Sequence, residues 1–163
     1  MHILFIQTGG TIDKDYPKKI KGYNFEITEP SVKRVLEKIN PAFTYEIKSL
    51  LKKDSRDITD NDRKRLKDFC IKAECSRIII THGTDTIIET AKYLSVIKDK
   101  TIILTGAFLP ERMKDSDADF NIGVAIGAVA NIPFGIYIAM NGIVHNYNKV
   151  KRNLKNGQFI ESK

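Results

Sequence analysis

The sequence predicts a single α/β domain with a doubly wound, mostly parallel sheet and helices on both faces. Short and almost uninterrupted apolar runs alternate along the chain with longer segments of helical periodicity. This alternation is typical of parallel βαβ units, and strands that are apolar on both faces are typical of a sheet covered by helices on both sides. A length of 163 residues fits one domain, and we find no repeat, low-complexity stretch or linker. We therefore treat residues 1–163 as one unit.

Five apolar runs are expected to form strands, at residues 2–8, 43–51, 77–81, 101–105 and 134–140. Apolar side chains recur at intervals of three and four between these runs, which predicts helices at residues 32–39, 60–73, 87–97 and 120–130. Thr86 and Glu89 have the spacing of a capping box at the start of the third helix. The polar segment 13–28 is expected to be an exposed loop or hairpin, and the polar tail 141–163 allows one or two short strands.

Composition argues against several classes of partner. The net charge of +7 comes from lysines spread along the chain without interleaved aromatic residues, so we expect a solvated basic surface and no nucleic-acid partner. The chain begins directly on a strand, without a charged leader, a long apolar stretch or a cleavage site. We therefore expect a cytoplasmic protein without membrane association. The spacing of Cys70 and Cys75 matches no metal motif, and we expect neither a metal nor a cofactor.

Hydroxyl, glycine and carboxylate residues follow four of the expected strands, at 8–12, 53–57, 81–86 and 105–107. Ligands of open parallel sheets bind beyond the carboxyl ends of the strands, so this edge is the predicted site. Taken singly, each segment has a structural explanation: Gly9-Gly10 can turn the chain, and Thr84-Asp85-Thr86 can cap a helix. His82 can be a general base, but a histidine in a turn is more often a hydrogen-bonded packing residue. Neither a Walker loop nor a dinucleotide-binding fingerprint is present.

Taken together, these segments resemble a known family. Thr8-Gly9-Gly10-Thr11-Ile12 after the first strand, combined with Thr81-His82-Gly83-Thr84-Asp85-Thr86 after a later one, resembles the two signature motifs of the bacterial-type (type I and II) L-asparaginases and glutaminase-asparaginases. The likeness extends from Met1 to about residue 155. Further segments similar to the family are Asp54–Asp57, Leu104–Pro110, Asp119–Asn121 and Met140–Gly142.

The resemblance implies roles for individual residues. Thr11 would be the nucleophile that attacks the side-chain amide, and Tyr23, in a mobile lid over residues 13–28, would help to activate it; Tyr16 matches less well. A threonine hydroxyl is a poor nucleophile until a neighbour accepts its proton. Thr84 would assist the attack or position water, and Asp85 would hold the α-ammonium group of the substrate.

The resemblance also implies a substrate-binding set. Ser55, in the Asp54–Asp57 loop with Asp57, would bind the α-carboxylate of the substrate. Backbone N–H groups of Gly10, Gly83 or Thr84 could stabilise the oxyanion that develops during attack. The predicted activity is hydrolysis of L-asparagine to L-aspartate and ammonia.

Three departures from the family pattern accompany this likeness. Family members are about twice as long, with a second domain that contributes subunit contacts. The family's catalytic lysine falls on Arg152, with Lys151 beside it, and an extended segment directs only one of the two toward the site. Arg56 stands in the place of the family's glutamine. Arginine does not accept a proton at working pH, so we expect weak activity if Arg152 faces the site.

Two alternative functions remain open from the sequence. A weakly active or non-catalytic module could bind an amino acid in the same pocket. The amide-hydrolysing subunit of an archaeal-type tRNA-dependent amidotransferase shares the motifs, although it normally carries additional N-terminal sequence. Apolar surface that a second domain would cover predicts a homodimer or a higher homo-oligomer.

Overall fold

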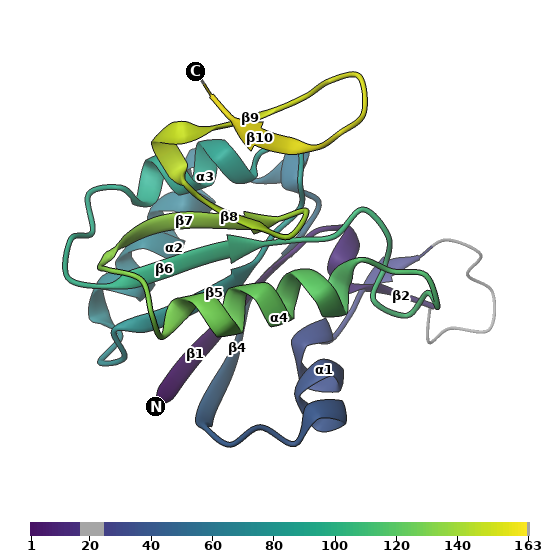
Figure 1. The fold of residues 1–163 in the computed structure, drawn as a ribbon, viewed down its shortest axis with the longest axis horizontal. Helices are drawn as coiled ribbons and strands as arrows, with labels where there is room; N and C mark the ends of the chain where they lie inside the picture. Colours follow the sequence, from purple (N-terminus) through teal and green to yellow (C-terminus); the bar gives the residue numbers. More distant parts are fainter. Residues whose placement is uncertain (17–24, 163) are drawn as a thin grey trace.

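A six-stranded sheet forms the centre of the molecule in the computed structural model, which describes residues 1–16 and 25–162 (Figure 1). Its order is β4 (Thr44–Lys53), β1 (His2–Gly9), β5 (Arg77–Thr81), β6 (Thr101–Thr105), β7 (Gly135–Met140) and β8 (Ile143–Asn146). Only the edge strand β8 is antiparallel to its neighbour. From β1 the chain first adds β4 on one side and then β5 on the other. The direction of winding therefore reverses between β1 and β5, and such a switch point is where open α/β sheets bind ligands.

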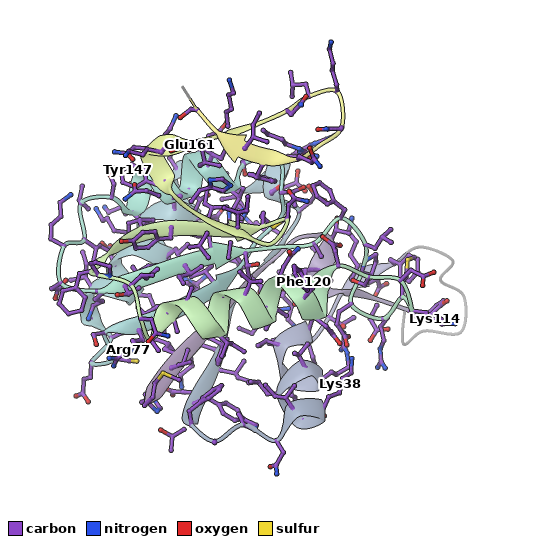
Figure 2. All side chains as sticks on the ribbon, viewed as in Figure 1. Lys38, Arg77, Lys114, Phe120, Tyr147 and Glu161 are labelled. Atoms are coloured by element: carbon purple, nitrogen blue, oxygen red, sulfur yellow. The ribbon has the colours of Figure 1, made fainter. Side chains whose placement is uncertain are left out.

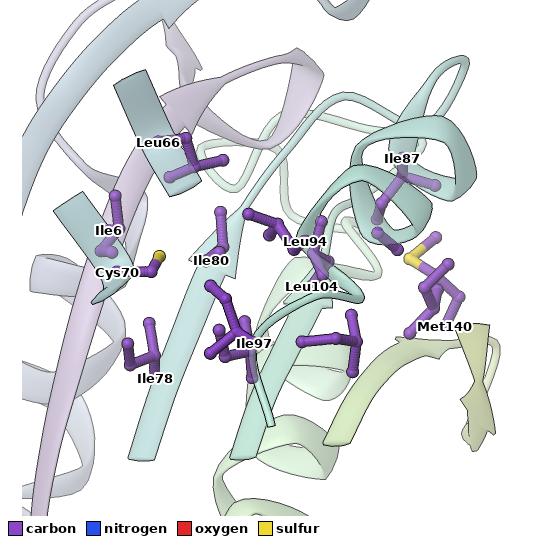
Figure 3. Close-up of a cluster of buried hydrophobic side chains, with 14 of the residues drawn as sticks. Ile6, Leu66, Cys70, Ile78, Ile80, Ile87, Leu94, Ile97, Leu104 and Met140 are labelled. Atoms are coloured by element: carbon purple, nitrogen blue, oxygen red, sulfur yellow. The ribbon is translucent and has the colours of Figure 1, made fainter. Parts of the chain in front are cut away.

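Two helices cover each face of the sheet. α2 (Asp60–Lys72) and α3 (Ile87–Leu94) pack on one face in a hydrophobic cluster that includes Leu66 and Leu94 (Figure 3). α1 (Ser31–Ile39) and α4 (Ala118–Val129) pack on the other face, where Leu36 and Ile122 belong to a second cluster. The predicted doubly wound α/β fold is confirmed.

The central strands are apolar throughout because their side chains serve both clusters. Side chains alternate between the two faces of a strand, so Ile78 and Ile80 contribute to the first cluster whereas Ile79 contributes to the second. β1 divides in the same way between Leu4 and Phe5. A sheet with only one buried face would show alternating polarity at these positions.

Two short antiparallel pairs of strands lie outside the main sheet. The pair β2 (Lys14–Asp15) and β3 (Glu26–Ile27) is antiparallel and falls within the segment predicted to form a lid, which stays a prediction. Near the C-terminus, η3 (Tyr147–Lys149) precedes the antiparallel pair β9 (Val150–Arg152) and β10 (Phe159–Glu161). Two side chains of that pair, Val150 and Phe159, join the first hydrophobic cluster. The C-terminal hairpin is therefore anchored beside α3 (Figure 1).

One local prediction was wrong. Thr86 is the N-cap residue of α3 but makes no side-chain capping bond. Its hydroxyl instead donates to the carbonyl oxygen of Ser55 at 2.7 Å, which ties the start of α3 to the loop after β4. A capping box does occur at α2, where Thr59 and Asp62 bond reciprocally. The tertiary contact to Ser55 therefore replaces the local cap at Thr86.

Several classes of feature are absent from the part of the chain that the structure describes. None of its helices combines the length and the apolar character needed to cross a membrane. Within residues 1–16 and 25–162, no three His, Cys, Asp or Glu side chains group in a way that could hold a metal ion. Cys70 and Cys75 are both free thiols. Burial raises the pKa of the Cys70 thiol to about 12, so this cysteine is a packing residue.

Candidate active site

Direct contact between two glycines joins the signature motifs at the switch point. A Cβ atom on Gly10 would lie 2.3 Å from the backbone N and Cα of Gly83, a distance that no side chain could tolerate. Gly10 also has φ +85° and ψ −176°, a conformation essentially restricted to glycine. The loops after β1 and β5 therefore touch backbone to backbone at the residues that precede Thr11 and Thr84.

Further close contacts extend this arrangement to the neighbouring loops. A Cβ atom on Gly83 would lie 2.6 Å from the Cβ of Ser55, in the loop after β4. One on Gly106, after β6, would lie 2.4 Å from the carbonyl oxygen of His82 and 3.4 Å from the Thr84 methyl group. Ser55 is buried at the start of η2 (Ser55–Asp57). Four strand ends therefore converge, three of them through glycines and the fourth through Ser55.

Thr11 begins the short helix η1 (Thr11–Asp13), and its position depends on the last residue of that helix. The buried carboxylate of Asp13 accepts hydrogen bonds from the backbone N–H and the hydroxyl of Ser31, both at 2.7 Å, and from the Thr81 hydroxyl at 2.9 Å. These bonds connect η1 to the start of α1 and to the end of β5. Burial raises the pKa of Asp13 in spite of these bonds. Sequence analysis missed Asp13 as a positioning residue.

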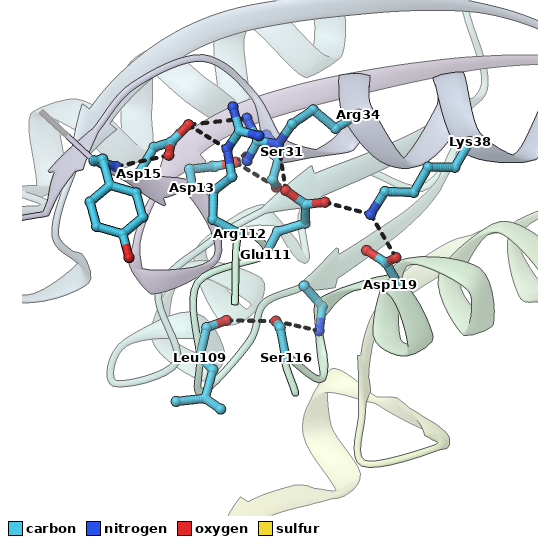
Figure 4. Close-up of polar contacts among 12 residues, drawn as sticks. Asp13, Asp15, Ser31, Arg34, Lys38, Leu109, Glu111, Arg112, Ser116 and Asp119 are labelled. Atoms are coloured by element: carbon cyan, nitrogen blue, oxygen red, sulfur yellow. Dashed lines mark hydrogen bonds and ion pairs between the residues drawn. The ribbon is translucent and has the colours of Figure 1, made fainter. Parts of the chain in front are cut away.

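A wider ionic network surrounds Asp13 on the α1 side of the site (Figure 4). Asp15 of β2 accepts from Arg112 at 2.8 Å, and Glu111 pairs with Arg34 and, at 2.8 Å, with Lys38. The network joins the β2 strand, α1 and the loop after β6. A cavity of about 260 Å³ lies among these charged side chains. None of the residues that line this cavity is a predicted site residue.

Two arginines hold the carboxylate of Asp85. Nη1 of Arg152 lies 2.6 Å from Oδ1, and Nε of Arg56 lies 2.7 Å from Oδ2. The hydrogen bond from Arg152, followed by that from Arg56, lowers the pKa of Asp85, so the carboxylate is ionised. The guanidinium of Arg152 also lies 5.5 Å from the centre of the Phe108 ring. β9 therefore directs Arg152 toward Asp85.

Three predicted site residues are not brought to this cluster. Lys151 alternates with Arg152 along β9 and is exposed. Asp57 is exposed on η2, and within residues 1–16 and 25–162 its carboxylate makes no hydrogen bond or ion pair. Tyr23 lies outside the described residues.

His82 occupies a buried position in a directed chain of hydrogen bonds. Its Nδ1 lies 2.8 Å from the carbonyl oxygen of Gly83 and its Nε2 lies 2.9 Å from the hydroxyl of Thr90, which also accepts from Arg63 Nε at 3.3 Å. A carbonyl can only accept, so Nδ1 carries the proton and Nε2 accepts from Thr90. Burial lowers the pKa of His82 to about 4. A neutral ring enclosed in this way is a packing and positioning residue, the second of the two interpretations above.

The hydrogen bond from His82 Nδ1 to the Gly83 carbonyl oxygen also fixes the orientation of the peptide between Gly83 and Thr84. In a trans peptide the N–H points opposite to the carbonyl, so the Thr84 N–H points away from the His82 ring. Within the described part of the chain this N–H makes no hydrogen bond. The Gly10 N–H, in contrast, donates to the carbonyl oxygen of Lys53 at 2.9 Å. Of the predicted oxyanion donors, Gly10 is therefore already engaged and Thr84 is not.

The sequence profile of one protein family, described as "Asparaginase, N-terminal", matches residues 2–157. The chain belongs to the asparaginase family. Its L-asparaginase relatives include L-asparaginase 2 of Escherichia coli (strain K12), 27% identical over 155 residues that cover 88% of this chain and 44% of the relative. The L-asparaginase of Thermococcus kodakarensis is 31% identical over 145 residues, which cover 85% of this chain and 44% of the relative.

A third relative is a component of an amidotransferase. This glutamyl-tRNA(Gln) amidotransferase subunit of Methanococcus maripaludis (strain C5) is 30% identical over 147 residues, which cover 86% of this chain and 35% of the relative. Asparaginase structures also superpose on this fold. The thermostable L-asparaginase from Thermococcus kodakarensis has a TM-score of 0.83 at 27% identity, over 99% of this chain and 51% of that one. L-asparaginase I from Vibrio cholerae has a TM-score of 0.83 at 23% identity, over 98% of this chain and 51% of that chain, and supports the fold alone.

The chain matches only part of each of these relatives. It spans about half the length of these relatives or less, between 35% and 44% of the three proteins matched by sequence and 51% of the two solved structures. The matched part is the N-terminal half, as expected from the motifs. At the predicted site of this chain, Arg56 and Arg152 both pair with the carboxylate of Asp85.

Figure 2 helps to locate the site on the molecule. Arg77, the first residue of β5, lies toward the end of the sheet where the parallel strands begin, whereas Lys114 lies toward the end where they finish. Phe120, near the start of α4, is largely exposed on the same side as Lys114. The site residues follow the carboxyl ends of the strands and so lie at this second end of the sheet.

Proposed function

We propose that this chain carries the amidohydrolase site of an L-asparaginase and hydrolyses the side-chain amide of L-asparagine to L-aspartate and ammonia, with Thr11 as the nucleophile. The observation that carries the proposal is the backbone contact between Gly10 and Gly83. It requires glycine at position 10, and it supports a shared site for Thr11 and Thr84, the residues that follow the two glycines. No metal or cofactor is needed for this chemistry.

Attack would proceed in two balanced steps. The Thr11 hydroxyl oxygen bonds to the amide carbon as its proton passes to a base. That proton then passes to the amide nitrogen, the C–N bond breaks, and ammonia leaves as the acyl-enzyme forms. Water then adds to the ester carbon and releases the acid together with the regenerated hydroxyl. The unengaged Thr84 N–H, oriented by His82, is suited to the oxyanion of both steps. We assign His82 a positioning role that acts through the Gly83–Thr84 peptide.

The proton acceptor is the weak part of this site. Arg152, at the family's lysine position, holds Asp85 and does not lose its proton at neutral pH. Lys151 is exposed, and Tyr23 lies outside the described residues. A missing general base typically costs ~10²–10⁴-fold in rate. We therefore expect turnover well below that of an asparaginase with a lysine at this position.

A coupled assay of ammonia release with L-asparagine, L-glutamine and D-asparagine tests the proposal. Thr11→Ala should abolish release from L-asparagine and leave the melting temperature nearly unchanged, because Thr11 is half-buried and its side chain makes no hydrogen bond within the described residues. Thr44→Ala is the control, because Thr44 begins β4 at the end of the sheet opposite the predicted site. Ordinary activity in Thr11→Ala would show that the nucleophile has been misassigned.

A second candidate function is a binding module that holds an amino acid without turnover. The observation that favours it is Arg152 at the family's lysine position, where it is held on Asp85 and cannot accept a proton. Calorimetric binding of L-asparagine without ammonia release would support this candidate. Ammonia release that Thr11→Ala removes would exclude it.

We also propose that the chain forms a homodimer or a higher homo-oligomer. Several large apolar side chains near the site are exposed, among them Phe108, Leu109, Met113, Phe120 and Ile143. Contiguous exposed apolar surface usually marks an interface. Light scattering at tens of micromolar protein tests this point. A strict monomer would refute it.

A further inference from the structure

The cluster of Arg56, Asp85 and Arg152 has an excess of positive charge where the proposed substrate would place its α-ammonium. Each carboxylate oxygen of Asp85 already accepts one guanidinium hydrogen bond, at 2.6 Å and 2.7 Å. Two guanidiniums and one carboxylate sum to one positive charge. An ammonium that approached Asp85 would therefore meet two like charges within a few ångströms, and such contacts are unfavourable even near a protein surface.

Neighbouring acidic groups do not remove this excess. Asp54, at the start of the same loop, is paired with Lys14 at 3.4 Å. Asp57 makes no ion pair with either arginine within residues 1–16 and 25–162. Among the described side chains, the arginines thus have Asp85 as their shared anionic partner.

Both guanidiniums retain donors for a further anion. A guanidinium has five N–H groups, and the hydrogen bond of Arg56 to Asp85 uses only its Nε. Arg152 uses Nη1, and its stacking against Phe108 restricts its position. The side chain of Arg56 is 77% exposed, so its terminal N–H groups are open to a ligand. The arrangement can therefore receive a carboxylate, whereas an ammonium would have to share Asp85 with two guanidinium groups.

We propose that Arg56 and Arg152 determine the specificity of this site, which binds a small amine-free dicarboxylate or its monoamide in preference to the corresponding α-amino acid. The inference rests on the proposed function in that both use the proposed site of Thr11, Ser55 and Asp85. It deepens that function by naming the class of ligand. An α-amino acid remains a substrate of this site, bound more weakly than its amine-free analogue.

Calorimetry with succinate and L-aspartate tests this preference, since the two dicarboxylates differ only in the α-ammonium group. We expect wild type to bind succinate about tenfold more tightly than L-aspartate, which corresponds to ~1.4 kcal/mol. Arg56→Gln should reduce the ratio to about one or below. Arg65→Gln is the matched control, because Arg65 is an exposed arginine of α2 outside this cluster. It should retain the wild-type ratio.

Turnover of succinamate and L-asparagine adds a second readout. We expect the ratio of kcat/KM for succinamate to that for L-asparagine to fall in Arg56→Gln and to stay unchanged in Arg65→Gln. L-aspartate binding as tightly as succinate to wild type would overturn the inference, and so would a failure of both ligands to bind. A wild-type preference for succinate that survives Arg56→Gln would also overturn the assignment to Arg56.

These results are distinguishable from failure of the proposed function. Binding is measured whether or not an amide is hydrolysed. If succinate is preferred but neither amide releases ammonia, the proposed hydrolysis fails while the charge selection stands. If both amides are hydrolysed through Thr11 but L-aspartate binds more tightly, the charge selection fails while the hydrolysis stands.

Discussion

The buried His82 makes the stability of the fold sensitive to mild acid. Burial lowers its pKa from 6.5 to about 4 in the folded chain, while the unfolded chain retains the ordinary value. The unfolded state therefore takes up the proton first as the pH falls. Stability that depends on the neutral ring is fully present above about pH 6.5 and is lost progressively toward about pH 4. A difference of roughly 2.5 pKa units corresponds to about 3 kcal/mol, a large share of the stability of a small domain.

The variant His82→Asn isolates this contribution. Its amide N–H can still donate to the Gly83 carbonyl, as Nδ1 does at 2.8 Å, but the side chain does not titrate. We expect the variant to be less stable than wild type at about pH 7.5, because Thr90 loses its acceptor. The difference in the free energy of unfolding between wild type and variant should then shrink by about 3 kcal/mol between about pH 7.5 and about pH 4.

Urea denaturation across this range, followed by circular dichroism, measures the difference. Taking wild type minus variant cancels the titration of Asp85, which lies near the site in both proteins. Parallel pH curves for the two proteins would refute the assignment of a neutral, buried His82. A difference that grows toward acid would refute the sign of the pKa shift.

Three further predictions concern the loops and the hairpin. Gly10→Ala should lower the free energy of unfolding by more than ~2 kcal/mol and abolish turnover. Gly123→Ala, on α4, has open space around the added methyl group and should raise the free energy of unfolding by ~0.5–1 kcal/mol. Denaturant melts measure both changes in stability. Asp13→Asn places an amide against the three donors of Ser31 and Thr81 and should cost ~1–3 kcal/mol together with most of kcat; ordinary kcat would refute the positioning role. Arg152→Lys should raise turnover and add a rise on the basic side of the pH–rate profile, because a lysine can release its proton. Lys151→Met should change neither. A loss of turnover in Lys151→Met would contradict the finding that Arg152, and not Lys151, faces Asp85.

Periodicity and turn chemistry were sufficient to predict the fold because its main determinants are local. The strands at Arg77–Thr81 and Thr101–Thr105 have the predicted bounds. Their uninterrupted isoleucines are explained by two buried faces, which only a doubly covered sheet provides. The helix after Thr86 was expected to begin with a local capping box, and this failed because the Thr86 hydroxyl bonds a residue distant in the sequence. Competition of this kind is not visible in a local pattern.

The local sequence reveals the role of some site residues, whereas the role of others depends on partners that are distant in the chain. Gly10 and Gly83 are detectable in the sequence because a side chain on Gly10 would collide with Gly83 and one on Gly83 would collide with Ser55. Asp13 gave no such signal, since its partners Ser31 and Thr81 are 18 and 68 residues away. The choice between Lys151 and Arg152 was open in the sequence, and the alternation of β9 directs Arg152 toward Asp85.

The steric and the electrostatic requirements of this site are therefore separable. The glycine contacts position the backbone at Thr11 and Thr84 without regard to charge, so the loops can retain their shape when the charges around Asp85 change. The pairing of Asp85 with Arg56 and Arg152 involves side chains that are partly or largely exposed, and exposed ion pairs contribute little to stability. Substitutions at these arginines should consequently alter which ligand binds and how fast it reacts, while the melting temperature changes little. Substitutions at Gly10 or Gly83 should remove stability and activity together. A variant of Arg56 that unfolds the chain would contradict this separation, because its guanidinium would then be part of the packing that holds the loops.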